Sequence, residues 1–144
     1  MKIIKEFFAR KGTGFYIACA AALLAIIEVI VYAVTFSAAE NTNLDVHFEV
    51  WLPTLFAVLV FVGLCLFKVT EDYAAAALFG LEFISFLTFV LNGYMYLTDV
   101  FFNGVTAEAF TSMNGGYAFC VIAYLLILVL SGAGVFVRQT RKAV

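Results

Sequence analysis

Residues 13–39 read TGFYIACAAALLAIIEVIVYAVTFSAA, and this stretch decides the fold. It contains one charged residue, Glu28, and no proline. A helix needs about 20 apolar residues to cross the hydrocarbon core of a bilayer, which is about 30 Å thick. The stretch exceeds that length, and its apolar core is too long for a secretory signal peptide. We therefore predict an uncleaved transmembrane helix.

Three further apolar stretches follow, at about 50–67, 73–98 and 117–137. None alternates apolar and polar residues, as strands of a membrane barrel do, whereas helices satisfy their own backbone hydrogen bonds in lipid. The short connection between the second and third stretches favours an antiparallel hairpin. We predict an all-α integral membrane protein with a single membrane domain over 1–144, a four-transmembrane-helix bundle that runs up-down-up-down.

The composition agrees with this prediction. Of the 144 residues, 65% are hydrophobic and 12% are charged, against about 45–50% and about 25% in soluble domains. A soluble domain of this size cannot bury so much apolar side chain. The composition therefore excludes a water-soluble enzyme, a disordered chain and a nucleic-acid-binding protein.

The charges predict the orientation. All eight basic residues fall on one predicted side: Lys2, Lys5, Arg10, Lys11, Lys68, Arg138, Arg141 and Lys142. On the other predicted side all charged residues are acidic: Glu40, Asp45, Glu49, Asp99 and Glu108. By the positive-inside rule, the N- and C-termini are cytoplasmic and the acidic loops 40–49 and 99–116 are on the non-cytoplasmic side.

The segment 1–12 predicts a short amphipathic helix at the cytoplasmic surface. Ile3, Ile4, Phe7 and Phe8 recur at helical spacing, opposite Lys2, Lys5 and Glu6. We expect it to lie along the inner leaflet, and we expect anionic lipid to contact it and the basic tail 138–144.

Small residues predict how the helices pack. Gly14, Ala18, Ala21 and Ala25 share one face of the first span, and Ser131 and Gly134 share one face of the fourth. Small residues let helices approach closely in lipid. We expect similar faces of the first, third and fourth spans to form the core, and the second span, with Pro53 in its first turn, to expose the most surface to lipid.

Two intramembrane acids are the strongest functional signal. Glu28 and Glu82 lie near the middle of their spans, with no basic residue at that depth. Such acids are costly in a membrane and by default mark ion pathways or proton relays. We expect both to be largely protonated at neutral pH, because burial disfavours the charged form. Their candidate neighbours at helical spacing are Tyr32, Ser85, Asn92 and Tyr96. Alternatively, protonated glutamates could simply hold the helices together by hydrogen bonds.

The outer loops give two weaker predictions. From Leu44 to Trp51 apolar and polar residues alternate, which favours a short extended segment. Asp45, His47 and Glu49 would then share one face and could bind Zn²⁺ or Mn²⁺. The preferred alternative is a solvated polar edge of the loop, because three ligands on one short segment rarely close a metal site without a fourth group. In the second loop, Thr106 is a candidate N-cap of a short helix.

Ala25-Ile26-Ile27-Glu28-Val29 is similar to the setting of the membrane-embedded glutamate in the small multidrug transporters, which also have four spans. The resemblance covers these few residues. The longer outer loops, the acid at Glu82 and the one-sided basic residues depart from that family, so no membership is inferred.

Nucleotide-binding, hydrolase and metalloprotease motifs are absent from the sequence, so we expect no enzyme activity and no cofactor. Our first hypothesis is a non-enzymatic accessory or assembly subunit, present as a homo-oligomer or in a larger membrane complex. The alternative is a small oligomeric transporter or channel for protons or cations that uses Glu28 and Glu82.

Overall fold

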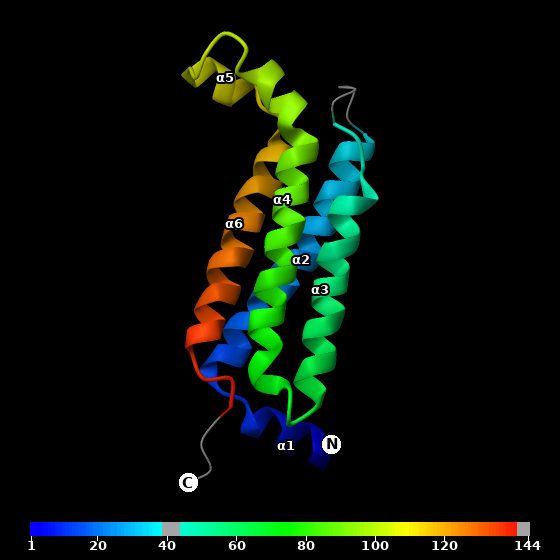
Figure 1. The fold of residues 1–144 in the computed structure, drawn as a ribbon, viewed down its shortest axis with the longest axis vertical. Helices are drawn as coiled ribbons and strands as arrows, with labels where there is room; N and C mark the ends of the chain where they lie inside the picture. Colours follow the sequence, from blue (N-terminus) through cyan, green and yellow to red (C-terminus); the bar gives the residue numbers. More distant parts are fainter. Residues whose placement is uncertain (39–43, 141–144) are drawn as a thin grey trace.

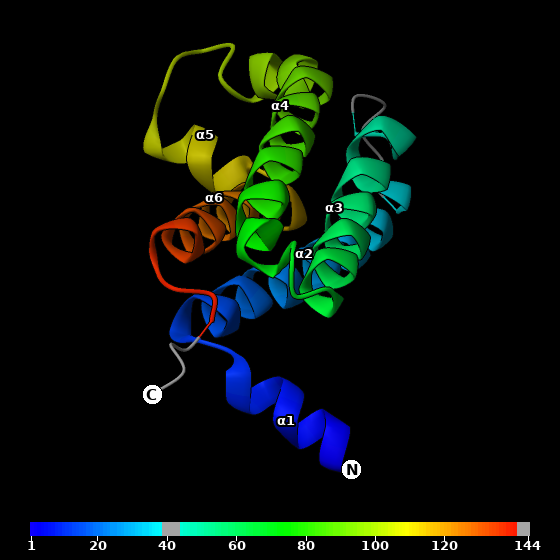
Figure 2. The same cartoon turned by 60° about the horizontal axis from the view of Figure 1, so that its bottom comes forward.

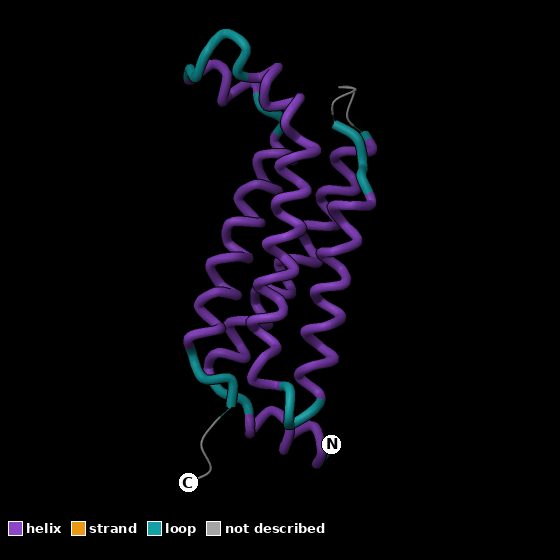
Figure 3. The backbone as a smooth tube through the Cα atoms, viewed as in Figure 1, coloured by secondary structure: helices purple, strands orange, loops and turns teal. Residues whose placement is uncertain are grey.

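The structure, a computed structural model, describes residues 1–38 and 44–140. Four long helices stand side by side and successive ones run in alternate directions (Figure 1): α2 (Thr13–Ser37), α3 (Phe48–Leu66), α4 (Ala74–Val100) and α6 (Gly115–Phe136). Three short helices connect or flank them: α1 (Lys2–Arg10), η1 (Glu71–Tyr73) and α5 (Ala107–Ser112). Within the described ranges the regular structure is helical throughout (Figure 3), apart from one isolated backbone bridge between Lys11 and Thr140.

All four long helices are long and apolar enough to cross a membrane, which confirms the prediction of a helical multi-pass membrane protein. The observed bounds differ by a few residues from those expected. Helix α3 begins at Phe48 rather than Val50, and α6 begins at Gly115 rather than Tyr117. Ala39 and Glu40, near the expected end of the first span, and Arg141 and Lys142 in the tail lie outside the described residues.

The early start of α3 corrects two expectations. The extended segment expected over 44–51 is wrong from Phe48 onward, because those residues are helical. Pro53 therefore lies past the first turn, and its missing N–H leaves the Glu49 carbonyl without a donor from its own helix. Thr88 of α4 can compensate, since its Oγ1 lies 3.0 Å from Glu49 O, although the same hydroxyl lies 2.8 Å from the Ser85 carbonyl of its own helix. The proline thus creates an acceptor that joins α3 to α4.

Helices α2 and α6 pack through small residues. A methyl group added at Gly134 would lie 3.3 Å from the Gly14 carbonyl oxygen and 3.4 Å from Ala18 Cβ. Ala21, Ala25 and Ser131 on the same seam are completely buried. These side chains are small enough for the two backbones to approach closely, as helices in lipid require.

Helix α3 contributes more to the core than its sequence suggests. Val50, Thr54, Ala57, Phe61 and Cys65 are buried, mostly in contact with α4 and α2. Its opposite face is apolar and exposed in the single chain, at Leu52, Phe56, Leu59 and Val62. All four long helices therefore contribute to the core, whereas the sequence pattern predicted a core formed mainly by the first, third and fourth spans.

Lys11 joins three segments at the basic end of the bundle. It is 1% exposed, and its Nζ donates to Glu71 Oε2 at 2.6 Å and to the Cys65 carbonyl at 3.0 Å. Arg10 Nη2 donates to the same Glu71 oxygen at 2.9 Å. The ammonium also lies 4.4 Å from the centre of the Phe7 ring, a cation–π contact. This cluster ties α1 to the turn between α3 and α4.

Backbone hydrogen bonds tie the same segment to the end of α6. Gly12 N donates to Gln139 O at 2.8 Å, and Gly14 N donates to Arg138 O at 3.0 Å. The Gln139 side-chain amide in turn donates to the Gly134 carbonyl. These bonds satisfy N–H groups at the start of α2 and a carbonyl at the end of α6. Such groups lack partners within their own helices.

Gly14→Ala tests the close approach of α2 and α6. The added methyl group would overlap the Val137 carbonyl oxygen and the Gln139 side chain. We expect unfolding in detergent micelles to become easier by about 1–3 kcal/mol, the usual cost of overpacking. Gly63→Ala is the matched control, because nothing lies within 4 Å of its added methyl group. Equal stability of the two variants would contradict this packing.

Lys11→Met tests the ion cluster. The substitution keeps the length of the side chain but leaves Glu71, which is 5% exposed, with Arg10 alone. Removing one partner of a buried pair costs about 3–5 kcal/mol, and we expect a loss toward that range in chemical unfolding. Lys5→Met removes the same charge from an exposed position of α1 and should have little effect. If both variants unfold alike, Lys11 does not hold the basic end together.

Candidate functional site

Six fully buried residues with ionisable or hydroxyl groups meet in the middle of the bundle. We call them the polar cluster: Glu28 of α2, Thr54 of α3, Glu82 and Ser85 of α4, and Cys120 and Tyr124 of α6, each 0% exposed. All four long helices contribute to it. No single segment of the sequence could form it, since each helix supplies one or two groups.

Helical spacing explains why each helix presents these groups. Glu28 follows Ala25 on the small-residue face of α2 that packs against α6. Glu82 and Ser85 are three residues apart, and Cys120 and Tyr124 are four apart. Residues at these spacings lie on one face of a helix. Each pair therefore enters the interior together.

Three hydroxyl groups of the cluster form a closed triangle. Tyr124 OH lies 3.0 Å from Thr54 Oγ1 and 3.0 Å from Ser85 Oγ, and the Thr54 and Ser85 hydroxyls are also hydrogen-bonded to each other. The Val50 carbonyl lies 2.7 Å from Ser85 Oγ and 3.1 Å from Thr54 Oγ1, so the three hydroxyl protons are shared among the contacts of the triangle and this acceptor. The triangle thus links α3, α4 and α6 and satisfies its own polar atoms.

The two carboxyl groups have no such partners. Neither oxygen of Glu28 and neither oxygen of Glu82 forms a hydrogen bond of ordinary geometry. The ion pairs that the described residues form at the basic end converge on Glu71 and leave both glutamates out. A buried carboxyl without a cation or a hydrogen-bond donor is costly in its charged form.

The carboxyl groups nevertheless lie within electrostatic reach of each other and of the cluster. Glu82 interacts with Glu28 through space. The Cys120 thiol and the Tyr124 hydroxyl lie close to the Glu28 carboxyl without meeting hydrogen-bond limits. Because their oxygens are not bonded to each other, the two glutamates do not form a hydrogen-bonded dyad. Ionising one would oppose ionisation of the other.

Apolar layers close both sides of the cluster. Toward the acidic loops, Phe89 lies 5.2 Å from Tyr124 and 5.2 Å from Tyr117, measured between ring centres. Tyr32 and Phe36 pack against the same aromatic group. Toward the basic end, the core is built mainly from small and aliphatic side chains: Ala18, Ala21, Ala22, Ala25, Ala57, Ala74, Ala75, Leu78 and Ile127. The cluster is therefore closed to water from both ends.

Several residues that the sequence suggested for this site act elsewhere. Tyr32 OH accepts from His47 N at 2.8 Å and so holds the segment before α3. Tyr96 OH accepts from Asn114 N at 2.6 Å and holds the start of α6. Asn92 donates to the Thr88 carbonyl one turn earlier in its own helix. Of the residues proposed for the site, the structure brings Glu28, Glu82 and Ser85 together.

The acidic loops do not assemble the suggested metal site. Glu49 belongs to the first turn of α3, while Asp45 and His47 precede the helix, so the three do not share one extended face. Among the residues described, no group of three His, Cys, Asp or Glu side chains could hold a metal ion. Thr106 does cap α5 as expected, since its side chain accepts from Ala109 N at 3.2 Å.

Three members of the cluster, Thr54, Cys120 and Tyr124, were not predicted from the sequence. Thr54 stands on a span without a continuous polar stripe, and Tyr124 stands among apolar residues of α6. A signal was present, because a hydroxyl in the middle of a membrane span needs a hydrogen-bond partner. Only the packing of α3 and α6 against α4 identifies Ser85 as that partner.

Comparison with protein-family models, with curated proteins and with solved structures found no match to this chain.

Tyr124→Phe tests the hydroxyl triangle. The change removes one corner and leaves Thr54 and Ser85 bonded to each other and to Val50. Hydrogen bonds between membrane helices contribute about 0.6–2 kcal/mol, and we expect a loss of that size in the free energy of unfolding in micelles. Tyr94→Phe is the control, because Tyr94 is 65% exposed. A Tyr124→Phe variant as stable as the control would show that the triangle does not hold the helices.

Proposed function

We propose that the protein is a small integral membrane protein whose Glu28 and Glu82 carboxyls bind and release protons, coupled to the passage of protons or small cations across the membrane. The observation that carries the proposal is the burial of both carboxyls, each 0% exposed, with all four oxygens lacking hydrogen-bond partners. Intramembrane acids of this kind are by default sites of ion or proton movement.

A purely structural role explains this arrangement poorly. Residues that join membrane helices are useful because they form hydrogen bonds, as Thr54 and Ser85 do here. Glu82 and Glu28 form none of ordinary geometry, although the Cys120 thiol and the Tyr124 hydroxyl lie close to Glu28, and the two acids bring mutually repelling charges when ionised. An acid differs from a serine or glutamine chiefly because it can exchange a proton. The unsatisfied oxygens are also the ligands that a hydrated proton or a small cation would take.

Proton exchange at the polar cluster needs one of the two layers that close it to open. Exchange with water requires either the aromatic layer around Phe89 or the alanine-rich layer around Ala21 to part. The two layers belong to different halves of the same helices, so tilting the pair α2 and α6 against α3 and α4 would open one side at a time. The most extensive contacts between helices in the bundle are those of α2 with α6 and of α3 with α4. Such movement is the general principle of alternating access.

The protein has a proposed orientation in the membrane and needs no enzymatic step for this function. We propose that the basic end, which carries α1 and Lys68, faces the cytoplasm, since basic residues are retained on that side. The exchange of protons at the two acids needs no nucleophile and no cofactor.

The second candidate is the accessory or assembly subunit, present as a homo-oligomer or in a larger membrane complex. The observation that favours it is the position of α5, which lies beside the bundle beyond the end of α4 (Figure 1). Phe102 is 82% exposed and Phe110 is 57% exposed in this region. Exposed aromatic side chains next to a membrane suit contact with a partner protein.

Glu28→Gln and Glu82→Gln test the transport proposal. We expect purified protein in liposomes to move protons, or a cation against a proton, when a potential or pH difference is applied, and a trapped pH-sensitive dye reports the flux. Each substitution keeps the size of the side chain but removes the exchangeable proton, so the flux should fall to that of protein-free liposomes. Glu108→Gln removes an exposed acid of α5 and should leave the flux unchanged.

The outcome separates the two candidates. Glutamine variants that behave as the unmodified chain would remove the proton-exchange role. Purification of the chain in a stable complex with an unrelated membrane protein, without flux of its own, would favour the accessory role.

A further inference from the structure

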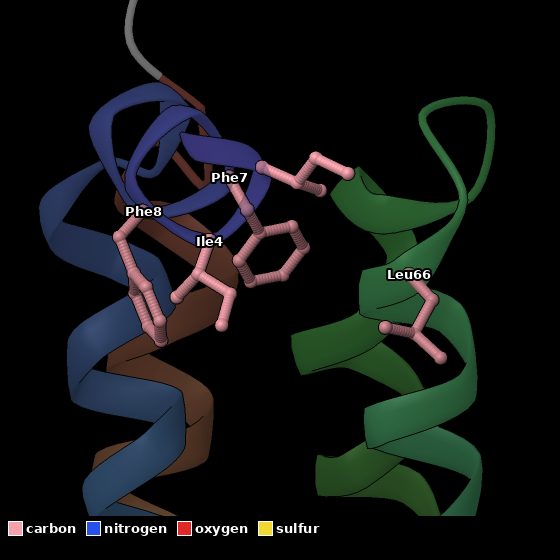
Figure 4. Close-up of a pocket in the computed structure, with 5 residues that line it drawn as sticks. Ile4, Phe7, Phe8 and Leu66 are labelled. Carbon is pink, nitrogen blue, oxygen red and sulfur yellow. The ribbon is translucent and has the colours of Figure 1, made fainter. Parts of the chain in front are cut away.

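A groove opens at the basic end between α1 and the end of α3. Its volume is about 400 Å³, and its lining is wholly apolar: Ile3, Ile4, Phe7, Phe8 and Leu66. In Figure 4, Ile4, Phe7 and Phe8 project from α1 toward the long helices, and the Phe7 ring faces Leu66 across the gap. In this region Ile3 is 81% exposed and Leu66 is 63% exposed.

Two further spaces adjoin the groove, one lined partly by charged residues and the other without charged residues. A space of about 480 Å³ shares Ile3, Phe7 and Leu66 with it and adds the charged residues Glu6, Arg10 and Lys68. A narrower slot of about 170 Å³ shares Phe7 and Leu66 and runs between α2 and α3, past Phe15, Cys19, Phe61, Val62 and Cys65. The whole space thus has a charged mouth, an apolar middle and an apolar tail directed into the bundle.

We propose that this space binds one anionic phospholipid of the adjacent leaflet, with its phosphate at Arg10 and Lys68 and an acyl chain in the slot toward Phe61. Two basic side chains line the mouth against one acid, Glu6. Arg10 uses Nη2 for Glu71, but its side chain stays 30% exposed. The exposed part of the guanidinium can donate to a phosphate oxygen, a strong acceptor for arginine.

The position of α1 supports a lipid rather than a soluble ligand. Helix α1 crosses the basic end of the bundle and extends beyond it (Figure 2). Its Lys2 and Lys5 are exposed, whereas Ile4, Phe7 and Phe8 point toward the long helices (Figure 4). Such a helix lies at the boundary between headgroups and acyl chains, where an anionic leaflet attracts its lysines. A lipid there would contact α1 and α3 at once and fix the angle of α1.

A tryptophan reporter tests the site in the full-length chain. Trp51, the only tryptophan, lies at the opposite end of α3, so Trp51→Phe combined with Phe8→Trp places the fluorescence in the groove. The protein is reconstituted in phosphatidylcholine vesicles, and brominated phosphatidylglycerol or brominated phosphatidylcholine is added as quencher. We expect phosphatidylglycerol to bind about fivefold more strongly for each basic contact it makes.

Two variants assign that preference to the groove. Lys68→Gln should reduce the preference for phosphatidylglycerol about fivefold, whereas Arg138→Gln, an exposed basic residue of the same end outside the groove, should leave it unchanged. Equal quenching by the two lipids would overturn the proposal. An equal loss in both variants would overturn it too, because it would indicate general surface attraction.

A second measurement covers the case in which the reporter variant does not fold. The unmodified chain and Lys68→Gln are purified in neutral detergent from membranes that contain phosphatidylglycerol, and the bound lipid is measured by mass spectrometry. Retention by the unmodified chain and loss from Lys68→Gln support the site. Equal amounts in both contradict it.

Discussion

A polar group in the interior of a membrane protein needs a hydrogen-bond partner from the protein, because neither lipid nor apolar side chains can replace water. This constraint organises the bundle. The carbonyl left free by Pro53 can accept from the Thr88 hydroxyl of the neighbouring helix. Tyr32 caps the backbone before α3, and Tyr96 caps the start of α6. Each bond also joins two segments that are distant in the sequence. The requirement for partners therefore fixes the register in which the helices pack.

The basic end follows the same rule with charges. Lys11 is buried, yet its ammonium contacts a carboxylate, a carbonyl and an aromatic ring. Backbone hydrogen bonds from Gly12 and Gly14 to the segment after α6 close this end of the bundle. Against this background Glu28 and Glu82 are exceptions, because the same interior leaves their oxygens without partners. Of the buried side-chain atoms without partners in the described residues, four belong to these two acids, at mid-depth in the bundle, and the other two, Arg10 Nε and Gln139 Oε1, belong to residues at the basic end.

Local sequence patterns were sufficient to predict the elements. Length and hydropathy predicted four spans, and the four long helices confirm them within a few residues at each end. The amphipathic pattern over 1–12 predicted α1, and Thr106 predicted the cap of α5. The alternation over 44–51 misled, because a helix that starts at Phe48 overrides a weak period-two pattern. Patterns of this kind report on one segment and its immediate surroundings.

By itself the sequence determined that the chain has four helices long and apolar enough to cross a membrane and that two acids lie within them, because both depend on hydrophobicity summed along one helix. Only the tertiary structure decided which groups meet. It brought Thr54 and Tyr124 to Ser85, left the oxygens of Glu28 and Glu82 without partners, and paired the hydroxyls of Tyr32 and Tyr96 with backbone amides outside the cluster. The physical reason is that contacts between helices depend on how each helix is rotated about its axis and how deep it lies relative to its neighbours. Side-chain packing between helices sets both, and the residue pattern within one helix does not reveal them.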